Sequence, residues 1–109
     1  MKLNLESVGE IIAERKLVLS RDGHAPTEIQ VLMGKPQNLL NHPDYYCPYQ
    51  LKGFGDEKVR AAWGVDAFQA MQLAMGTIGV QLEVMGRESG GTIAWDAGVQ
   101  GDLGFPISH

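Results

Sequence analysis

The sequence contains a single cysteine, Cys47, so no disulfide bond can form within the chain. Chains without structural disulfides are typical of a reducing compartment. The opening residues, 1–16, carry three glutamates and no apolar stretch after a basic start, which argues against a secretory signal. Together these absences predict a cytoplasmic protein.

The sequence also lacks an unbroken apolar segment of the length that crosses a membrane. Its longest uncharged stretch, residues 67–82, is interrupted by three glutamines and a threonine: Gln69, Gln72, Gln81 and Thr77. A transmembrane helix needs about 20 predominantly apolar residues. We therefore expect this stretch to be covered by protein and not by a membrane.

Basic residues are scarce in the second half of the chain. Residues 1–60 hold eight acidic and eight basic side chains, whereas residues 61–109 hold five acidic side chains against Arg87 alone, which accounts for the net charge of −4. An acidic surface repels phosphate backbones, so nucleic acid is not an expected partner. The same charge would attract a basic protein, although it also serves solubility.

Motifs that hold a metal, a phosphate group or a catalytic nucleophile are absent too. The three histidines are far apart, and no C-x-x-C or H-x-x-x-H spacing occurs. Cys47 and His42 lie five residues apart, a separation that matches no catalytic signature. We therefore predict no catalytic residues, no metal and no cofactor, and keep an enzyme only as the less favoured alternative.

What the sequence does contain is a series of short segments with β-type alternation. In residues 27–34, TEIQVLMG, the apolar Ile29, Val31 and Met33 point one way and the residues between them the other. Asp22-Gly23 predicts a turn before this segment. The expected strands are residues 14–20, 27–34, 46–53, 58–64 and 92–97.

Two of these strands are open to a second interpretation. The first is expected to start at about Ile12, but Ser7 and Glu10 also fit the capping box of a short helix, so residues 7–13 are either helix or strand. Pro48 lacks an amide donor, so its segment is expected at a sheet edge or with an irregular start.

One long helix is predicted from about Asp66 to Met85. Asp66 is a good N-cap, Gln69 completes the capping-box pattern, and Gly86 is a natural terminator. The predicted fold class is therefore α+β. A single domain is expected, in which the helix packs across an antiparallel sheet of four to five strands in the order β-β-β-β-α-β.

The predicted helix is apolar on two sides. A helical spacing of about 100° per residue gathers six large apolar residues into an inner stripe that would face the sheet: Phe68, Met71, Met75, Ile78, Leu82 and Met85. An outer stripe of Leu73, Val80 and Val84 lies nearly opposite. Gly76 and Gly79 predict that something approaches the helix closely, because glycine destabilises an exposed helix interior.

Two coverings of the outer stripe are possible. The chain's own termini could fold over it, through Leu103, Phe105 and Ile107 or through Leu3 and Leu5. Alternatively, a partner covers it, either a second copy of the chain or another protein. The sequence alone does not decide between them.

Several segments together resemble a known family: IIAERKLVL (11–19), GVDAFQAMQLAMGTIGVQL (64–82), a later strand with a tryptophan, and DLGFP (102–106). That family consists of small bacterial proteins and is catalogued as a domain of unknown function. Its most specific elements here are the helix start at residues 66–70 and the segment Leu103-Gly104-Phe105-Pro106. The resemblance implies a bacterial origin and a single-domain architecture, and it brings no activity or site residues.

The residues favour a non-catalytic protein-interaction domain, with the immunity or antitoxin kind, which neutralises a bacterial toxin by binding it, as one form. Small size, an acidic second half and the spare apolar stripe support this hypothesis. The expected partner-binding residues are Leu73, Val80, Val84, Glu88, Asp96 and Asp102. The alternative is a small-molecule-binding or enzymatic domain with a site near the tyrosine-rich segment His42–Tyr49.

Overall fold

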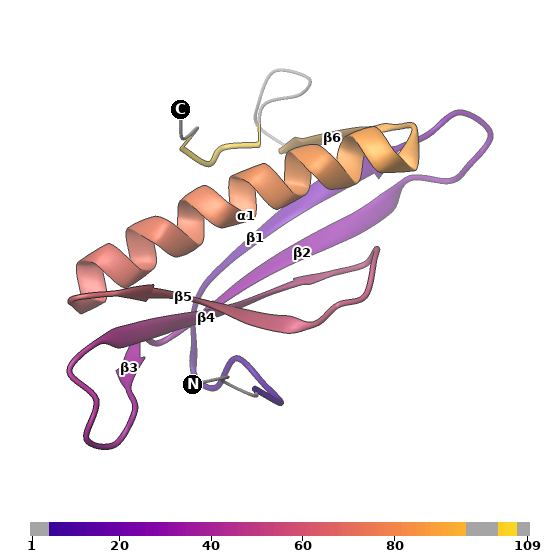
Figure 1. The fold of residues 1–109 in the computed structure, drawn as a ribbon. Coiled ribbons are helices and arrows are strands. Elements are labelled where there is room, and N and C mark those ends of the chain that lie inside the picture. The colour runs from indigo at the N-terminus through magenta and orange to yellow at the C-terminus, as the bar shows by residue number, and fades with distance from the viewer. Residues whose placement is uncertain (1–4, 96–102, 107–109) are drawn as a thin grey trace.

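The computed structural model describes residues 5–95 and 103–106, which form an antiparallel sheet and a long helix (Figure 1). The elements in chain order are β1 (Ile11–Ser20), β2 (Thr27–Gly34), β3 (Gln37–Asn38), β4 (Tyr45–Lys52), β5 (Val59–Gly64), α1 (Ala67–Ser89) and β6 (Thr92–Trp95). The α+β class and the single long helix are confirmed. The additional strand, β3, has two residues and is too short to show an alternating pattern.

Strand β4 lies inside the sheet, with neighbours along both of its edges. β5 pairs with residues 45–50 of β4, while β3 and β2 share the other edge, at residues 45–46 and 49–52. The expectation that Pro48 marks an edge strand is therefore wrong. Pro48 falls between the residues that pair with β3 and those that pair with β2, so its missing amide costs no bond to either of them.

The remaining strands complete the sheet on the β2 side. β1 pairs with β2, and β6 pairs with the second half of β1, so β5 and β6 are the outer strands of the described sheet. α1 connects these two strands and therefore crosses one face of the whole sheet (Figure 1).

Strand β1 begins at Ile11, which confirms the strand interpretation of the first segment. Ile11 pairs with Gly34 of β2. Ser7 caps no helix, because residues 8–10 are not helical and the strand follows directly. Its Oγ accepts a local hydrogen bond from the backbone amide of Gly9 at 3.2 Å. The long pairing with β2 outweighs the local helix signal.

Helix α1 begins where the capping pattern places it. The Asp66 carboxylate accepts a hydrogen bond from the backbone amide of Gln69 at 2.8 Å. The Gln69 side chain in turn accepts one from the backbone amide of Val65 at 2.7 Å. The Asp66 bond satisfies an amide that the first turn of a helix leaves unpaired, and the Gln69 bond fixes the chain just before the helix.

Helix α1 ends about one turn later than predicted. It continues through Gly86 to Ser89, and Gly90 follows with a left-handed φ of 73°. Gly86 is buried, and a Cβ atom placed on it would lie 3.8 Å from the side chain of Ile93 in β6. Gly86 therefore marks contact between the helix and the sheet, and Gly90 is the terminator.

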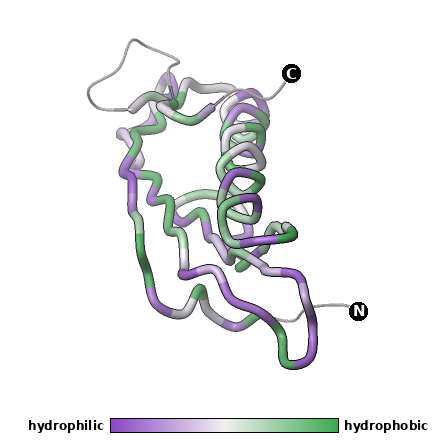
Figure 2. Tube along the Cα trace, turned by 90° about the vertical axis from the view of Figure 1, so that its left-hand side faces the viewer, coloured by the Kyte–Doolittle hydropathy of each residue, from purple (hydrophilic) through white to green (hydrophobic). Residues whose placement is uncertain are grey.

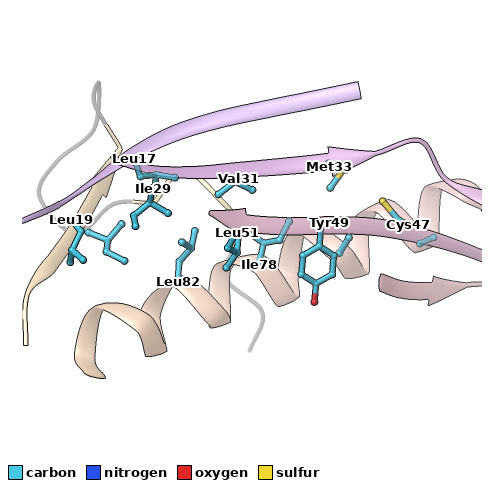
Figure 3. Packing of buried hydrophobic residues seen from close by; sticks show 13 residues of the cluster. Leu17, Leu19, Ile29, Val31, Met33, Cys47, Tyr49, Leu51, Ile78 and Leu82 are labelled. Carbon is cyan, nitrogen blue, oxygen red and sulfur yellow. The ribbon is translucent and has the colours of Figure 1, made fainter. Parts of the chain in front are cut away.

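The hydrophobic core lies between two layers, the sheet and the helix (Figure 2). Leu17 and Ile29 point from the sheet toward Leu82 of the helix (Figure 3). The buried cluster consists of Leu17, Leu19, Ile29, Val31, Met33, Cys47, Tyr49, Leu51, Ala70, Ala74, Ile78, Leu82 and Ile93. The core thus draws on β1, β2, β4, β6 and α1.

The predicted inner stripe of the helix is confirmed at its centre and wrong at its start. Ile78 and Leu82 are fully buried, but Phe68 is 79% exposed. The reason is the close approach of β5, where a Cβ atom on Gly64 would lie 2.4 Å from the backbone nitrogen of Ala70. Only small side chains fit at this contact, so Ala70 is buried and Phe68 points away.

The tail, residues 103–106, runs alongside α1 (Figure 1). A Cβ atom on Gly79 would lie 3.3 Å from the Pro106 carbonyl oxygen and 3.5 Å from the Phe105 side chain. This tight contact explains one of the two glycines, Gly76 and Gly79, that predicted a close approach, and the approaching segment is the chain's own tail.

Candidate interaction surface

The outer stripe of α1 is exposed along one side of the helix. Leu73 and Val80 are 48% and 49% exposed, and Val84 is half-buried. Glu88 is exposed one turn beyond Val84. We call these four residues the outer face. They are four of the six residues predicted to bind a partner.

The described parts of both termini leave this face largely open. The tail touches α1 at Gly79, through Pro106, and not over Leu73 or Val80, which keep about half of their surface. Leu5 lines a hollow beside β4 instead. Within residues 5–95 and 103–106, the chain's own termini therefore cover only the flank of the outer face. Leu3 and Ile107, also considered as covers, lie outside the described residues, as do the predicted partner-binding residues Asp96 and Asp102.

A hollow of about 340 Å³ opens between the outer face and the turn that joins β4 to β5, and we call it the turn hollow. Its lining consists of Val80, Gln81, Val84, Met85 and Glu88 from α1, with Leu51, Phe54, Gly55, Asp56, Glu57 and Arg60 opposite. Three of the predicted residues therefore meet in one place. The turn residues are a part of this surface that the sequence did not indicate, because only the folded hairpin brings the segment GFGDEK against the helix.

The β4–β5 turn is held by hydrogen bonds within its own segment. The backbone amide of Gly53 donates to the Glu57 carboxylate at 2.9 Å, and the Gln50 side chain donates to the Glu57 carbonyl at 2.8 Å. The Asp56 carboxylate accepts from the backbone amide of Lys58 at 3.0 Å. These bonds give the side chains that line the hollow a defined arrangement.

The charge around the turn hollow is negative. Its lining carries three carboxylates, Asp56, Glu57 and Glu88, against the single guanidinium of Arg60, a net charge of −2. Arg60 donates to both carboxylate oxygens of Asp56, at 3.2 and 2.9 Å. These bonds, with the one from the Lys58 amide, hold the pKa of Asp56 below its ordinary value.

A second hollow, of about 550 Å³, lies on the other side of the outer face, between α1 and Pro106 of the tail. Leu73, Gly76 and Val80 belong to its lining. Val80 therefore lies between the two hollows, and the apolar residues of the outer face, Leu73, Val80 and Val84, form a ridge with a depression on each side.

The alternative ligand site, segment His42–Tyr49, is divided between the two faces of the sheet. Tyr49 lies in the core, between the sheet and α1 (Figure 3), whereas Tyr46 points to the opposite face of the sheet, where its ring centroid is 5.6 Å from that of Trp63. The His42 ring also lies beside Trp63, at 5.3 Å. The structure therefore does not gather the tyrosines of this segment into one pocket.

Cys47, the only cysteine, is fully buried in the core. Its Sγ lies 3.7 Å from the carbonyl oxygen of Gly34. Burial raises the pKa of the Cys47 thiol to about 11. Because the thiolate is the reactive form, this cysteine is a poor nucleophile at neutral pH.

No helix within residues 5–95 and 103–106 combines the length and the apolar character needed to cross a membrane. The same residues bring together no group of three or more histidine, cysteine, aspartate or glutamate side chains that could hold a metal ion.

A family model described as Domain of unknown function (DUF6968) matches residues 13–107 of the chain. No curated protein and no solved structure matches the chain. The residues matched by the family model include all of α1 and the β4–β5 turn, so the outer face and the turn hollow both lie within them.

Proposed function

The chain belongs to this family, the domain of unknown function DUF6968, and on that premise we propose that it is a non-catalytic protein-interaction domain that binds another protein through the outer face of α1. The observation that carries the proposal is the exposure of Leu73 and Val80 on a helix whose opposite side packs against the sheet through the fully buried Ile78 and Leu82. A helix lying on a sheet normally turns polar residues to solvent, and an apolar ridge between two hollows is typical of a binding surface.

Charge favours a different protein over a second copy of the chain as the occupant. Glu83 and Glu88 are exposed on α1, and Asp56 and Glu57 are exposed on the neighbouring turn. Two copies placed face to face would bring these carboxylates together, which is unfavourable. A partner with basic groups around an apolar patch gains from the same arrangement, so we expect a basic protein and no nucleic acid.

Within this function we place the protein among the immunity or antitoxin proteins of the bacterial cytoplasm, which neutralise a toxin by covering a basic site. The single cysteine and the acidic second half of the chain support this assignment. The assignment is narrower than the interaction itself, and identifying the partner tests it separately.

The test is capture of the partner from lysate of the source organism by the tagged chain, compared with a Leu73→Glu, Val80→Glu double variant. Charges in the centre of an apolar contact leave unpaired groups on binding, so we expect capture to fall at least about tenfold. Size-exclusion chromatography with light scattering on the same samples measures whether the chain binds itself.

A second double variant, Ile12→Glu and Leu40→Glu, controls for added charge. Ile12 and Leu40 are 43% and 92% exposed and lie outside α1, so this variant should capture the partner as the unaltered chain does. Circular dichroism establishes that both variants are folded. Equal capture by both double variants would rule out the outer face as the binding surface, and a dimer dissociated only by the α1 variant would identify a second copy as the occupant.

A further inference from the structure

We propose that the turn hollow receives an arginine side chain of the partner protein. This inference rests on the proposed function, because it specifies the chemistry of the partner at one end of the outer face. It is carried by the apolar walls of the hollow, by the charges at its rim and by one acceptor that lacks a donor.

The walls of the turn hollow suit the aliphatic part of an arginine. Val80, Val84 and Met85 form the side contributed by the helix, and Leu51 and Phe54 belong to the opposite side. Long basic side chains bury their methylene stems along such surfaces while the charged end stays at polar groups. The guanidinium carbon of Arg21 already lies 5.4 Å from the centroid of the Phe54 ring, so Phe54 contributes apolar wall and not a free stacking face.

The charges at the rim of the hollow favour a cation as its occupant. Asp56 is already paired with Arg60, whereas Glu88 forms no ion pair among the described residues. Glu57 has one carboxylate oxygen engaged by the Gly53 amide. Two carboxylates therefore face the hollow without a cationic partner, and the only cation in the lining is occupied. This charge distribution excludes a phosphate or carboxylate as the preferred ligand.

An unpaired acceptor in the wall points to a hydrogen-bond donor. The side-chain oxygen of Gln81, a residue of the lining, is shielded from solvent and accepts no hydrogen bond from the described residues. Buried polar atoms of this kind are normally satisfied. A guanidinium carries five N–H donors in a rigid fork, so it can donate to a carboxylate of the rim and, once the Gln81 amide turns its oxygen toward the hollow, to that oxygen as well.

The inference is tested on the isolated full chain with a small probe, N-acetyl-arginine amide. The probe is titrated into the ¹⁵N-labelled protein to about 50 mM, well above the millimolar Kd expected for one side chain. We expect saturable shifts of the amide signals of Phe54, Gly55, Val84 and the Gln81 side chain. N-acetyl-citrulline amide, which has the same shape without the charge, should leave these signals in place.

Two conservative variants test whether the arginine probe binds through a carboxylate of the rim. Glu88→Gln removes a carboxylate of the rim and should weaken the arginine probe about two- to fivefold, as expected for an accessible ion pair. Glu83→Gln removes a carboxylate of the same helix that does not line the turn hollow and should leave the Kd unchanged. Absence of shifts at the hollow, equal shifts with citrulline, or equal effects of both variants would each overturn the inference.

The two proposals fail separately. The probe titration needs no partner, and the Leu73→Glu, Val80→Glu experiment needs no arginine. If the outer-face variant loses capture while the probe leaves the hollow unaffected, the interaction function stands and the arginine assignment falls. If the probe binds as expected and the outer-face variant captures normally, the hollow binds arginine, and docking of the partner through Leu73 and Val80 is ruled out.

Discussion

The guanidinium carbon of Arg15 lies 4.0 Å from the centroid of the Trp95 ring. The tail closes the other side of this contact, with the Phe105 ring centroid 4.8 Å away, and the Gly104 carbonyl accepts a hydrogen bond from the same guanidinium. One cation therefore joins β1, β6 and the tail. This arrangement holds residues 103–106 on the flank of α1, where Pro106 borders the outer face without covering Leu73 and Val80.

Replacing Arg15 with methionine keeps most of the aliphatic stem and removes the charge and the donors. We expect the free energy of unfolding to fall by about 1–3 kcal/mol, from the lost cation–π contacts and the lost charged hydrogen bond. Urea denaturation followed by tryptophan fluorescence measures the change. The neighbouring exposed lysine provides the control: Lys16→Met should stay within about 0.5 kcal/mol of the unaltered chain. An equal loss in both variants would contradict the role given to Arg15.

Truncating two apolar residues of α1 should change the free energy of unfolding by very different amounts. Leu82 is fully buried, so Leu82→Ala should cost about 2–5 kcal/mol through lost burial and an unfilled cavity. Phe68 is the larger side chain, yet it is 79% exposed. Phe68→Ala should therefore change the free energy of unfolding by no more than about 0.5 kcal/mol. A large loss for Phe68→Ala would show that this residue packs against the sheet after all.

The contact between β5 and the first turn of α1 leaves no room for a side chain at Gly64. Its added Cβ would meet backbone atoms of the helix, which cannot move aside as a flexible side chain does. We expect Gly64→Ala to cost about 3 kcal/mol or more. Gly23 provides the comparison. Its φ of 77° strains a side-chain-bearing residue, but nothing lies within 4 Å of an added Cβ, so Gly23→Ala measures the backbone strain without the steric clash. Gly23→Ala should cost only about 1–2 kcal/mol, and thermal unfolding that ranks the two variants in the reverse order would contradict the close approach.

Burial of Cys47 should appear both in its reactivity and in the pH dependence of stability. With a pKa of about 11 in the folded chain and an ordinary value of 9.0, the thiolate at pH 8 is about a hundredfold scarcer in the folded state. Iodoacetamide should therefore modify the native protein at least about a hundredfold more slowly than the urea-unfolded chain. Similar rates in the two states would show that the thiol is accessible.

The sign of the pH effect follows from which state ionises first. The unfolded thiol loses its proton at about pH 9 and the folded thiol at about pH 11, so the free energy of unfolding should fall between these values and level off above them. Burial also raises the pKa of Tyr49, which acts in the same direction. Cys47→Ala should make the fall of the unfolding free energy with pH less steep, and the contribution of Tyr49 to that fall should remain. A stability that rises over this range would contradict both assignments.

The strands and the helix were predictable because their signals are local. The alternation of Ile29, Val31 and Met33 and the capping pair Asp66 and Gln69 depend on neighbouring residues only, and both appear in the structure as expected. The position of each strand within the sheet was not predictable in the same way. Pro48 is tolerated inside the sheet because β3 and β2 divide one edge of β4 between them, a relation between segments that no local pattern records.

The sequence by itself determined the α+β class, the existence of a two-sided apolar helix and the residues of the outer stripe. Only the tertiary structure decided which parts of that helix are covered. The close approach of β5 at Gly64 excludes Phe68 from the core, and the tail meets Gly79 and leaves Leu73 and Val80 exposed. The hollow beside Glu88 likewise exists only because a hairpin carries its turn to the helix. The physical reason is that periodicity specifies which side of an element is apolar, whereas burial depends on how closely distant segments can approach.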